Sequence, residues 1–325
     1  MKNFIYLFAL LLALSACKKN VLEPMSDCDP LPPEPRLGWN YIFPDTGYSA
    51  PCFNPENPDE IIYREHHFST GEFWLCKLNL KTMKKEYILQ GNFWSEPKWG
   101  KEDWIIFTLS DANIYKIHSN GTNLTQLTFI GKCFDPGWSH DYNKIYYSSY
   151  IILSDTTRPG IPPPQQQKEI GISMDLDGKF IDTLWGGWGN GMAPINDSMA
   201  ASVDMVFPTT GLSLFNFKSG GYKFIYKNNS SDGVGGLGIA QITDKEFLWS
   251  SEQGLYVTNI SSKLTFQLKE TCNSNYYSHP TYSTQLNKII MEHTIKIPKG
   301  DIMDGSHNIV MMNPDGTGEE EIKIP

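Results

Sequence analysis

Short motifs that recur about every 40 to 50 residues constrain the fold of this 325-residue chain more than any other feature. Each repeat opens on a small or charged residue followed by proline and continues through short apolar strands and polar turns. The opening pairs are Ala50-Pro51, Glu96-Pro97, Asp135-Pro136, Ala193-Pro194 and His279-Pro280, with Ile239-Ala240 in the remaining place. Repeats of this length with four short strands are typical of β-propellers. The sequence therefore predicts an all-β fold, a six-bladed β-propeller of four-stranded antiparallel blades over residues 38–325.

Apolar runs and the turns that bound them place the strands inside each repeat. Second strands are predicted at Glu60–Arg64, Trp104–Thr108, Lys144–Ser148, Glu246–Ser250 and Lys288–Glu292. Third strands are predicted at Glu72–Leu78, Asn113–Ile117, Glu169–Met174, Leu212–Phe217, Leu255–Asn259 and Asn308–Asn313. Hairpin turns with glycine, which tolerates the positive φ of such turns, follow at Asn120-Gly121, Asp177-Gly178, Gly220-Gly221 and Asp315-Gly316.

A propeller must close its ring so that no long edge strand stays exposed, and two segments are candidates for the closing strand. Ile322 lies six residues after Gly316, as Leu127 lies six residues after Gly121, so the C-terminal segment can supply the outer strand of blade six. The segment Trp39–Phe43 is the alternative. The sequence leaves both open.

One repeat carries a family resemblance. Residues 113–128 contain Ile114-Tyr115, Asn120-Gly121-Thr122 and Gln126-Leu127-Thr128, and this pattern resembles the TolB-like, or WD40-like, propeller repeat. The resemblance extends over about residues 38–325 and implies the propeller fold. The Pro-Asp-Gly turn of the family is His140-Asp141-Tyr142 here, and residues 1–37 offer no counterpart of the α/β domain that precedes the propeller in TolB. The resemblance therefore implies the fold and not the role of TolB.

The first 17 residues are typical of a secretory signal, with a short polar start and an apolar run from Phe4 to Ala13. Such a run is too short to cross a membrane, which needs about 20 helical residues. The sequence Leu14-Ser15-Ala16-Cys17 resembles the lipobox of bacterial lipoproteins, which implies a signal peptide over residues 1–16 and lipid on the thiol of Cys17. An ordinary signal peptide with a cysteine at its cleavage site is the alternative.

Residues 17–37 are predicted to be the lipidated cysteine and a proline-rich tether, because five prolines follow Cys17 and little of the segment could be buried. An extended tether of this kind reaches roughly 60 Å at ~3.1 Å per residue. Lys18 follows the cysteine, whereas an Asp there retains enterobacterial lipoproteins at the inner membrane. By that resemblance we expect a lipid anchor in the outer membrane of the cell envelope, on either its periplasmic or its outer side.

The charge and the cysteine content limit which binding partners and which metal or disulfide sites are expected. The formal net charge is −9 and is spread along the chain, so nucleic acid is not an expected partner. Five cysteines besides Cys17 are an odd number, and they show no zinc-binding spacing: Cys28, Cys52, Cys76, Cys133 and Cys272. Cys76 is predicted to lie in a buried strand. A disulfide such as Cys28–Cys52 is compatible with an oxidising compartment, but the sequence does not determine the pairing.

Long loops are predicted at one end of the propeller channel. The insertions Ser149–Lys168 and His293–Ser306 both separate a second from a third strand, so they share a face with the inter-blade connections Gly186–Gly191 and Ser230–Gly238. Loops around a rigid channel are a usual place for recognition. The expected binding face is therefore this one.

Four residues are the candidate ligand-binding residues: Glu96, Asp135, Trp188 and His279. Glu96, Asp135 and His279 precede innermost strands, as does Met192, and we expect them to ring the channel, with Trp188 as a stacking surface. The structural alternative is that they cap strand ends or bond to neighbouring backbone groups.

Two further motifs lack the context that their chemistry requires. Arg64-Glu65-His66-His67 contains zinc-binding residue types, but neighbouring strand residues point to opposite faces, so a solvated loop is the preferred interpretation. Gly233–Gly238 fits the dinucleotide pattern G-x-G-x-x-G but leads into a predicted strand, Ile239–Ile242, instead of a helix. The sequence therefore predicts no catalytic residue, no metal site and no cofactor.

These features favour a membrane-anchored envelope lipoprotein whose propeller binds a protein or glycan without catalysis. An enzyme that acts on polysaccharide through acid and base residues at the channel mouth is the alternative. A structural member of a complex of several lipoproteins is a third interpretation, and it would require an exposed apolar patch.

Overall fold

The computed structural model describes residues 40–42, 44–153, 166–184, 186, 191–206, 209–229, 236–251, 254–271, 275–299 and 302–325. The predicted signal peptide over 1–16, Cys17 and the tether lie outside the described residues, as do Trp188, Cys28 and Cys272.

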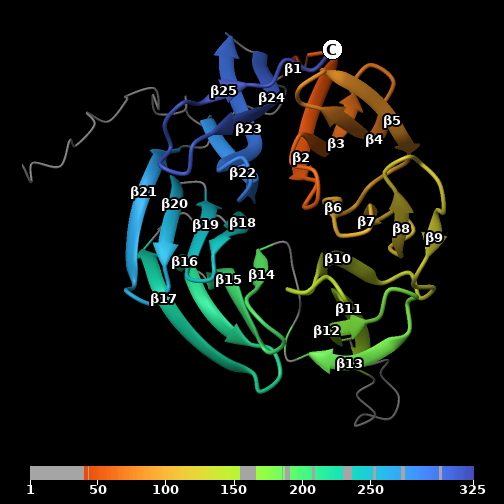
Figure 1. The fold of residues 1–325 in the computed structure, drawn as a ribbon, viewed down its shortest axis with the longest axis vertical. Coiled ribbons are helices and arrows are strands. Elements are labelled where there is room, and N and C mark those ends of the chain that lie inside the picture. Colours follow the sequence, from red (N-terminus) through yellow and green to blue (C-terminus); the bar gives the residue numbers. More distant parts are fainter. Residues whose placement is uncertain are drawn as a thin grey trace, which may run out of the picture.

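Six β-sheets surround a common axis (Figure 1). Blade one contains β2 (Thr46–Phe53), β3 (Glu60–His67), β4 (Glu72–Asn79) and β5 (Lys84–Gln90). Blade two contains β6 (Lys98–Trp99), β7 (Trp104–Thr108), β8 (Ile114–His118) and β9 (Thr125–Gln126). Blade three contains β10 (Cys133–Trp138), β11 (Ile145–Leu153), β12 (Gln166–Met174) and β13 (Phe180–Leu184).

The remaining blades follow in chain order around the ring (Figure 1). Blade four contains β14 (Met192–Pro194), β15 (Met199–Val206), β16 (Thr209–Asn216) and β17 (Gly221–Asn229). Blade five contains β18 (Gly236–Thr243), β19 (Glu246–Ser251), β20 (Gly254–Asn259) and β21 (Leu264–Glu270). Blade six contains β22 (Asn275–Ser283), β23 (Lys288–Lys299), β24 (Ile302–Met312), β25 (Glu320–Glu321) and β1 (Asn40–Ile42). The predicted six-bladed propeller is confirmed.

Consecutive strands of a blade, counted from the axis outward, run in opposite directions. The two ends of the ring therefore carry different kinds of connection. Turns between first and second strands and between third and fourth strands lie at one end, which we call the hairpin end. Connections between second and third strands and between blades lie at the other, which we call the loop end.

Both candidate segments close the ring, and they use different halves of the same strand. In β25, Glu321 pairs antiparallel with Val310 of β24, and the Ile322 N–H donates to the Ile309 carbonyl at 2.9 Å. In β1, Asn40 pairs parallel with Ile302 at the opposite end of β24. Because β24 is long, neither segment alone covers its outer edge.

The innermost strands bulge where the recurring proline pairs lie. The register shifts at Ala50-Pro51, Asp135-Pro136 and His279-Pro280, and the residue before each proline has a positive φ, of 50°, 51° and 53°. In blade four Pro194 pairs normally with Ala200, so Ala193-Pro194 is not an equivalent pair. In blade five the bulge lies at Gly236–Gly238 instead of Ile239-Ala240. The predicted repeat alignment is therefore wrong in these two degenerate blades.

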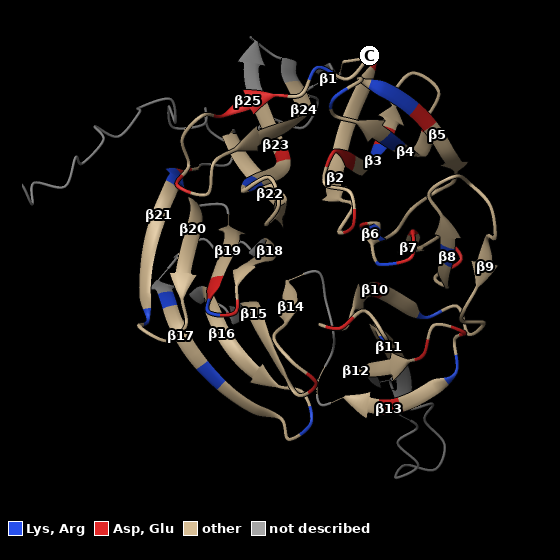
Figure 2. Cartoon of the chain, in the orientation of Figure 1, with Lys and Arg blue, Asp and Glu red and all other residues tan. Residues whose placement is uncertain are grey.

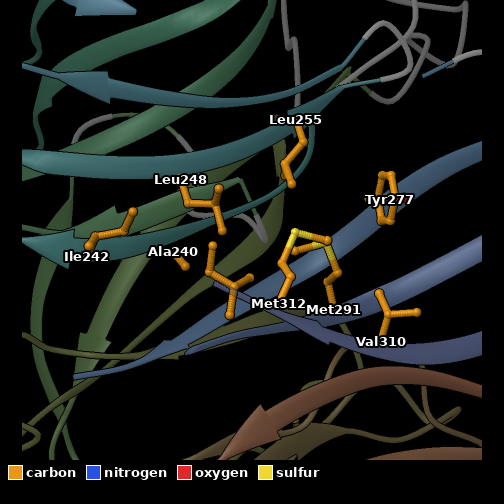
Figure 3. Close-up of a cluster of buried hydrophobic side chains, with 9 residues drawn as sticks. Ala240, Ile242, Leu248, Leu255, Tyr277, Met291, Val310 and Met312 are labelled. Atoms are coloured by element: carbon orange, nitrogen blue, oxygen red, sulfur yellow. The ribbon is translucent and has the colours of Figure 1, made fainter. Parts of the chain in front are cut away.

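Apolar side chains pack between neighbouring blades all the way around the ring. Each of the six buried clusters draws residues from two adjacent blades, as Figure 3 shows for Ala240 and Leu248 of blade five with Met291 and Met312 of blade six. Removing this surface from water stabilises the fold by about 25 cal/mol per Å². Since each blade has an apolar neighbour on both sides, the closed ring is the arrangement that buries both faces.

The predicted second and third strands agree with the structure to within a few residues, but the predicted insertions do not. Residues 293–306 are largely strand and not a loop, because β23 runs to Lys299 and β24 begins at Ile302 in one continuous antiparallel register. The alternating apolar residues of Thr294–Ile297 continue the strand pattern. In blade three β11 extends to Leu153 and β12 begins at Gln166, which shortens the predicted loop.

Three cysteines are described, and all three are free and buried: Cys52, Cys76 and Cys133. The buried-strand position predicted for Cys76 is confirmed, since it lies on β4 with no exposed surface. Acidic and basic residues are scattered over the blades (Figure 2). Across the described ranges, no helix is long and apolar enough to span a bilayer.

Candidate functional site

A chain of ion pairs links blade two to blade six. Glu96 lies just before β6, and its Oε1 is 2.7 Å from Nε2 of His279 on β22. The other ring nitrogen of His279, Nδ1, lies 3.0 Å from Oε2 of Glu292 on β23. His279 is thus held between two carboxylates, and blade one lies between the blades that supply them.

The chain extends at both ends. Oε1 of Glu292 lies 3.0 Å from Nδ1 of His307 on β24, and the Thr294 hydroxyl donates to the same oxygen at 3.2 Å. At the other end, Lys98 Nζ donates to Oε2 of Glu96. Glu96 and Glu292 are 4% and 6% exposed, so the two carboxylates are nearly removed from solvent, whereas the His279 side chain is 25% exposed.

The charges of the cluster stabilise one another. Burial by itself would lower the pKa of His279, but the Glu96 and Glu292 carboxylates raise this pKa to about 9. Burial would likewise raise the pKa of Glu96, yet the charges on His279 and Lys98 lower it to about 2. The pKa of Glu292 is also lowered, by His279 and His307 against the effect of burial. At neutral pH the cluster therefore holds a protonated histidine between two ionised carboxylates.

Asp135 and Met192 complete the predicted ring. Asp135 lies within β10, and its charge acts on Lys98, whose pKa it helps to raise together with Glu96 against the effect of burial. Asp135 and His279 lie inside their strands, at bulges, and not before them as predicted. The structure thus brings Glu96 into contact with both Lys98 and His279 and places Asp135 near Lys98, while Met192 begins β14.

The backbone strain at Asp135 and His279 has a structural origin. Ala50, which has no chemistry of its own, adopts the same positive φ before the same proline at the same level of its blade. A bulge requires such a conformation wherever it occurs. The strain therefore belongs to the repeat and does not by itself mark a binding residue.

A cavity of about 450 Å³ occupies the channel next to this cluster. All six innermost strands line it, through Phe53, Trp99, Trp138, Met192, Ile239, Thr281 and their neighbours. It also contacts turns between first and second strands, at Pro55, Lys101, His140 and Gln285. The cavity therefore lies towards the hairpin end, opposite to the loop end where the sequence placed the binding face.

Chemically, the cavity combines aromatic rings with hydrogen-bond donors. Lys98 and Lys101 line it, and none of the described lining residues is Asp or Glu. The Trp138 Nε1–H donates to the Lys98 carbonyl at 3.0 Å. Trp99 is 2% exposed, and its buried Nε1–H has no acceptor among the described residues. The cavity is open to solvent on one side, and its volume lies within the range of small-molecule sites.

Sequence reasoning missed Lys98, Glu292 and His307. A signal for Glu292 does exist in the repeat, because the fifth residue of most predicted second strands is polar and directly follows an apolar or aromatic residue. These residues face the innermost strand at the level of the bulge: Arg64, Thr108, Ser148, Ser250 and Glu292. No comparable signal marks His307.

The Arg64–His67 motif forms part of strand β3 and not a solvated loop. Glu65 is 1% exposed, and its carboxylate binds His67 Nε2 at 2.7 Å and the hydroxyl of Tyr87 at 3.0 Å. His66 points to the other face and stacks on Phe73. Within the described part of the chain, no group of three His, Cys, Asp or Glu side chains is arranged to hold a metal ion.

The glycine-rich motif Gly233–Gly238 is described only from Gly236 onward, and there it belongs to strand β18. The predicted strand after the motif is thus confirmed. A dinucleotide-binding loop would instead lead into the N-terminus of a helix.

Fold and channel define the chain as a six-bladed β-propeller that resembles the propellers of TolB and of acylaminoacyl peptidases. No protein-family model matches the chain, and no curated protein matches its sequence. A putative TolB from Agrobacterium tumefaciens is similar with a TM-score of 0.52 and 12% identity, over 75% of this chain and 86% of that one.

Two peptidase structures are similar over more of the chain. A puromycin-hydrolysing peptidase from Mycobacterium tuberculosis has a TM-score of 0.55 and 12% identity, over 86% of this chain and 47% of its own. Pyrococcus horikoshii acylaminoacyl peptidase has a TM-score of 0.55 and 10% identity, over 86% and 52%. This chain spans about half the length of these peptidases, and at such identity the likeness shows the fold alone.

Proposed function

We propose that this protein is a lipid-anchored envelope lipoprotein whose propeller binds a ligand in its axial channel without catalysis. The observation that carries the proposal is the 450 Å³ cavity, which all six innermost strands line and whose wall combines aromatic rings with hydrogen-bonding side chains. Pockets for small ligands range from about 300 to 1,000 Å³. A cavity at the lower end of this range fits a saccharide unit better than a folded protein, so a glycan is the proposed ligand.

The polar cluster contacts Lys98, a residue of the cavity wall. Glu96 binds both Lys98 and His279, Asp135 lies near Lys98, and Lys98 lines the cavity. Glu96 orients the lysine, and the charge of Glu96 is compensated by Lys98 and His279. In this proposal the three predicted residues shape the site, while Trp188 lies outside the described residues.

Catalysis is not favoured by the observed contacts. Glu96 and Glu292 both bind His279, so their oxygens are occupied by cations and point at the same imidazole. No described lining residue of the cavity is a carboxylic acid that could donate a proton or attack a sugar. The geometry therefore supports a binding protein over a polysaccharide-cleaving enzyme.

Membrane attachment is tested by substituting the lipidated residue. The variant Cys17→Ala should move from the membrane fraction to the soluble envelope fraction, since two or more acyl chains hold a protein on a bilayer and none does. Continued membrane association of Cys17→Ala, at wild-type level after a salt wash, would contradict the anchor.

Ligand binding is tested by filling the cavity. Thr281 lines the cavity and is partly exposed, so Thr281→Trp places a large ring in the open space. We expect the full chain, purified in detergent, to bind members of a glycan array, and Thr281→Trp to lose that binding. Thr82→Trp, on an exposed hairpin turn away from the cavity, is the matched control. Equal binding by both variants would remove the cavity from consideration.

A further inference from the structure

The cavity wall carries positive charge, whereas the chain as a whole is negatively charged. The protein has a formal net charge of −9, yet the charged residues among the described residues that line the cavity are Lys98 and Lys101, with His140 beside them. A described lining without carboxylates disfavours a cationic ligand and favours an anionic one.

The two lysines are not equivalent. Lys98 already forms an ion pair with Glu96. Lys101 lies at the turn after β6, where its ammonium group is 5.3 Å from the centre of the Tyr142 ring. Among the described residues, no carboxylate forms an ion pair with Lys101. Its positive charge therefore remains available to a ligand.

Trp138 supplies an aromatic face beside the two lysines. Its indole N–H donates to the Lys98 carbonyl at 3.0 Å, so the protein itself fixes the position of this ring in the cavity wall.

Aromatic faces and amides form the rest of the wall. Trp138, Tyr142 and Tyr282 line the cavity together with Gln241. Flat rings beside amide groups suit a ligand with an apolar ring face and hydroxyl groups at its edge. A simple aliphatic carboxylate would leave this surface unused.

We propose that the cavity binds an acidic sugar, with the sugar carboxylate near Lys101 and the sugar ring against the aromatic side chains of the cavity wall. The inference rests on the proposed function, because it assumes that the axial cavity is the ligand site. It adds the chemical class of the ligand, which the fold alone does not give.

The experiment is calorimetric titration of the full chain in detergent with glucuronic acid, galacturonic acid, the corresponding neutral sugars and propionate. Acidic sugars should bind at least ten times more tightly than neutral sugars and than propionate. Added salt should lower the affinity for the acidic sugars. Lys101→Met should lower acidic-sugar affinity about tenfold and leave neutral-sugar affinity unchanged. Lys245→Met, at the equivalent turn of blade five but outside the lining, is the control and should bind like the wild type.

The possible outcomes separate the two proposals. If neutral and acidic sugars bind equally and Thr281→Trp abolishes both, the acidic class is wrong and the binding function stands. If acidic sugars bind and Lys101→Met has no effect, the assignment of the carboxylate is overturned. If no sugar of the panel binds, and the glycan array is also empty, both proposals fail. Oligoglucuronides, titrated in parallel, distinguish a free sugar acid from the end of a polysaccharide.

Discussion

Replacing His279 tests whether the ion-pair chain holds the ring together. The variant His279→Asn keeps a residue type that tolerates the positive φ of 53° but removes the cation between Glu96 and Glu292. Two carboxylates that are 4% and 6% exposed then lose a partner. Breaking a buried ion pair in this way costs about 3 to 5 kcal/mol.

The raised pKa of His279 gives a second value for the loss of stability expected in His279→Asn. Its ordinary value is 6.5, and the two carboxylates raise it to about 9 in the folded protein. At about 1.36 kcal/mol per pH unit, this difference corresponds to about 3 kcal/mol of stability. Because the side chain is 25% exposed, the lower end of the range for buried pairs is the appropriate one. In a chain of this size the melting temperature should fall by about 6 °C.

The direction of each pKa shift determines how the stability contribution of that group changes with pH. A raised histidine pKa contributes stability that is fully present below pH 6.5 and is lost as the pH rises from 6.5 through about 9. The lowered pKa of Glu96 acts at the other end, with a contribution that is present above pH 4.5 and is lost as the pH falls through about 2. The wild type should therefore exceed His279→Asn by about 3 kcal/mol at pH 6 and by much less at pH 10.

Urea unfolding followed by tryptophan fluorescence, at pH 6, 7.5, 9 and 10, measures this difference. The exposed His140→Asn is the control, and it should change the free energy of unfolding by less than about 0.5 kcal/mol at every pH. A difference between wild type and His279→Asn that is absent at pH 6, or that is the same at pH 6 and pH 10, would refute the reasoning.

Three further substitutions test the closure, the packing and the cavity. Ile322→Ala should lower the free energy of unfolding by about 2 kcal/mol in urea titrations, because Ile322 packs between blades six and one, whereas exposed Ile130→Ala should not; equal effects would contradict closure by the C-terminal strand. Gly100→Ala should cost about 1 to 3 kcal/mol by thermal unfolding, since a Cβ there would overlap the Trp138 indole, and wild-type stability would show that this contact is not tight. Trp99→Phe, at a residue that lines the cavity, should change the unfolding free energy by less than about 1 kcal/mol, because the lost ring volume is offset by removal of an unpaired N–H. A large loss of stability in Trp99→Phe would mean that its N–H has a partner within the protein.

Much of the fold follows from local sequence patterns. A strand such as Trp104–Thr108 is bounded by turn residues and rich in β-branched and aromatic side chains, and the predicted bounds equal those of β7. The recurring proline pairs located the bulges of blades one, three and six. Where the pair is absent, or as in blade four occurs at another level, the same reasoning gave the wrong alignment.

The candidate site could be predicted only in part. The pair Glu96 and His279 was found because both residues precede a proline of the repeat, and the repeat placed them at one level of the channel. Their contact to Glu292 and His307 depends on the side-chain directions of two other strands. The cavity at the hairpin end was not predicted, because residues from all six blades form it and no single segment contains a pattern that indicates it.

The sequence by itself determined the strands, their repeat and the number of blades, because alternation and turn chemistry act between residues close along the chain. Only the tertiary structure decided that β1 and β25 both pair with β24 of blade six and that a histidine of blade six lies between carboxylates of blades two and six. It also decided that the described residues lining the cavity include no carboxylate. These contacts join residues far apart in the chain, and it is the closure of the ring that brings them together.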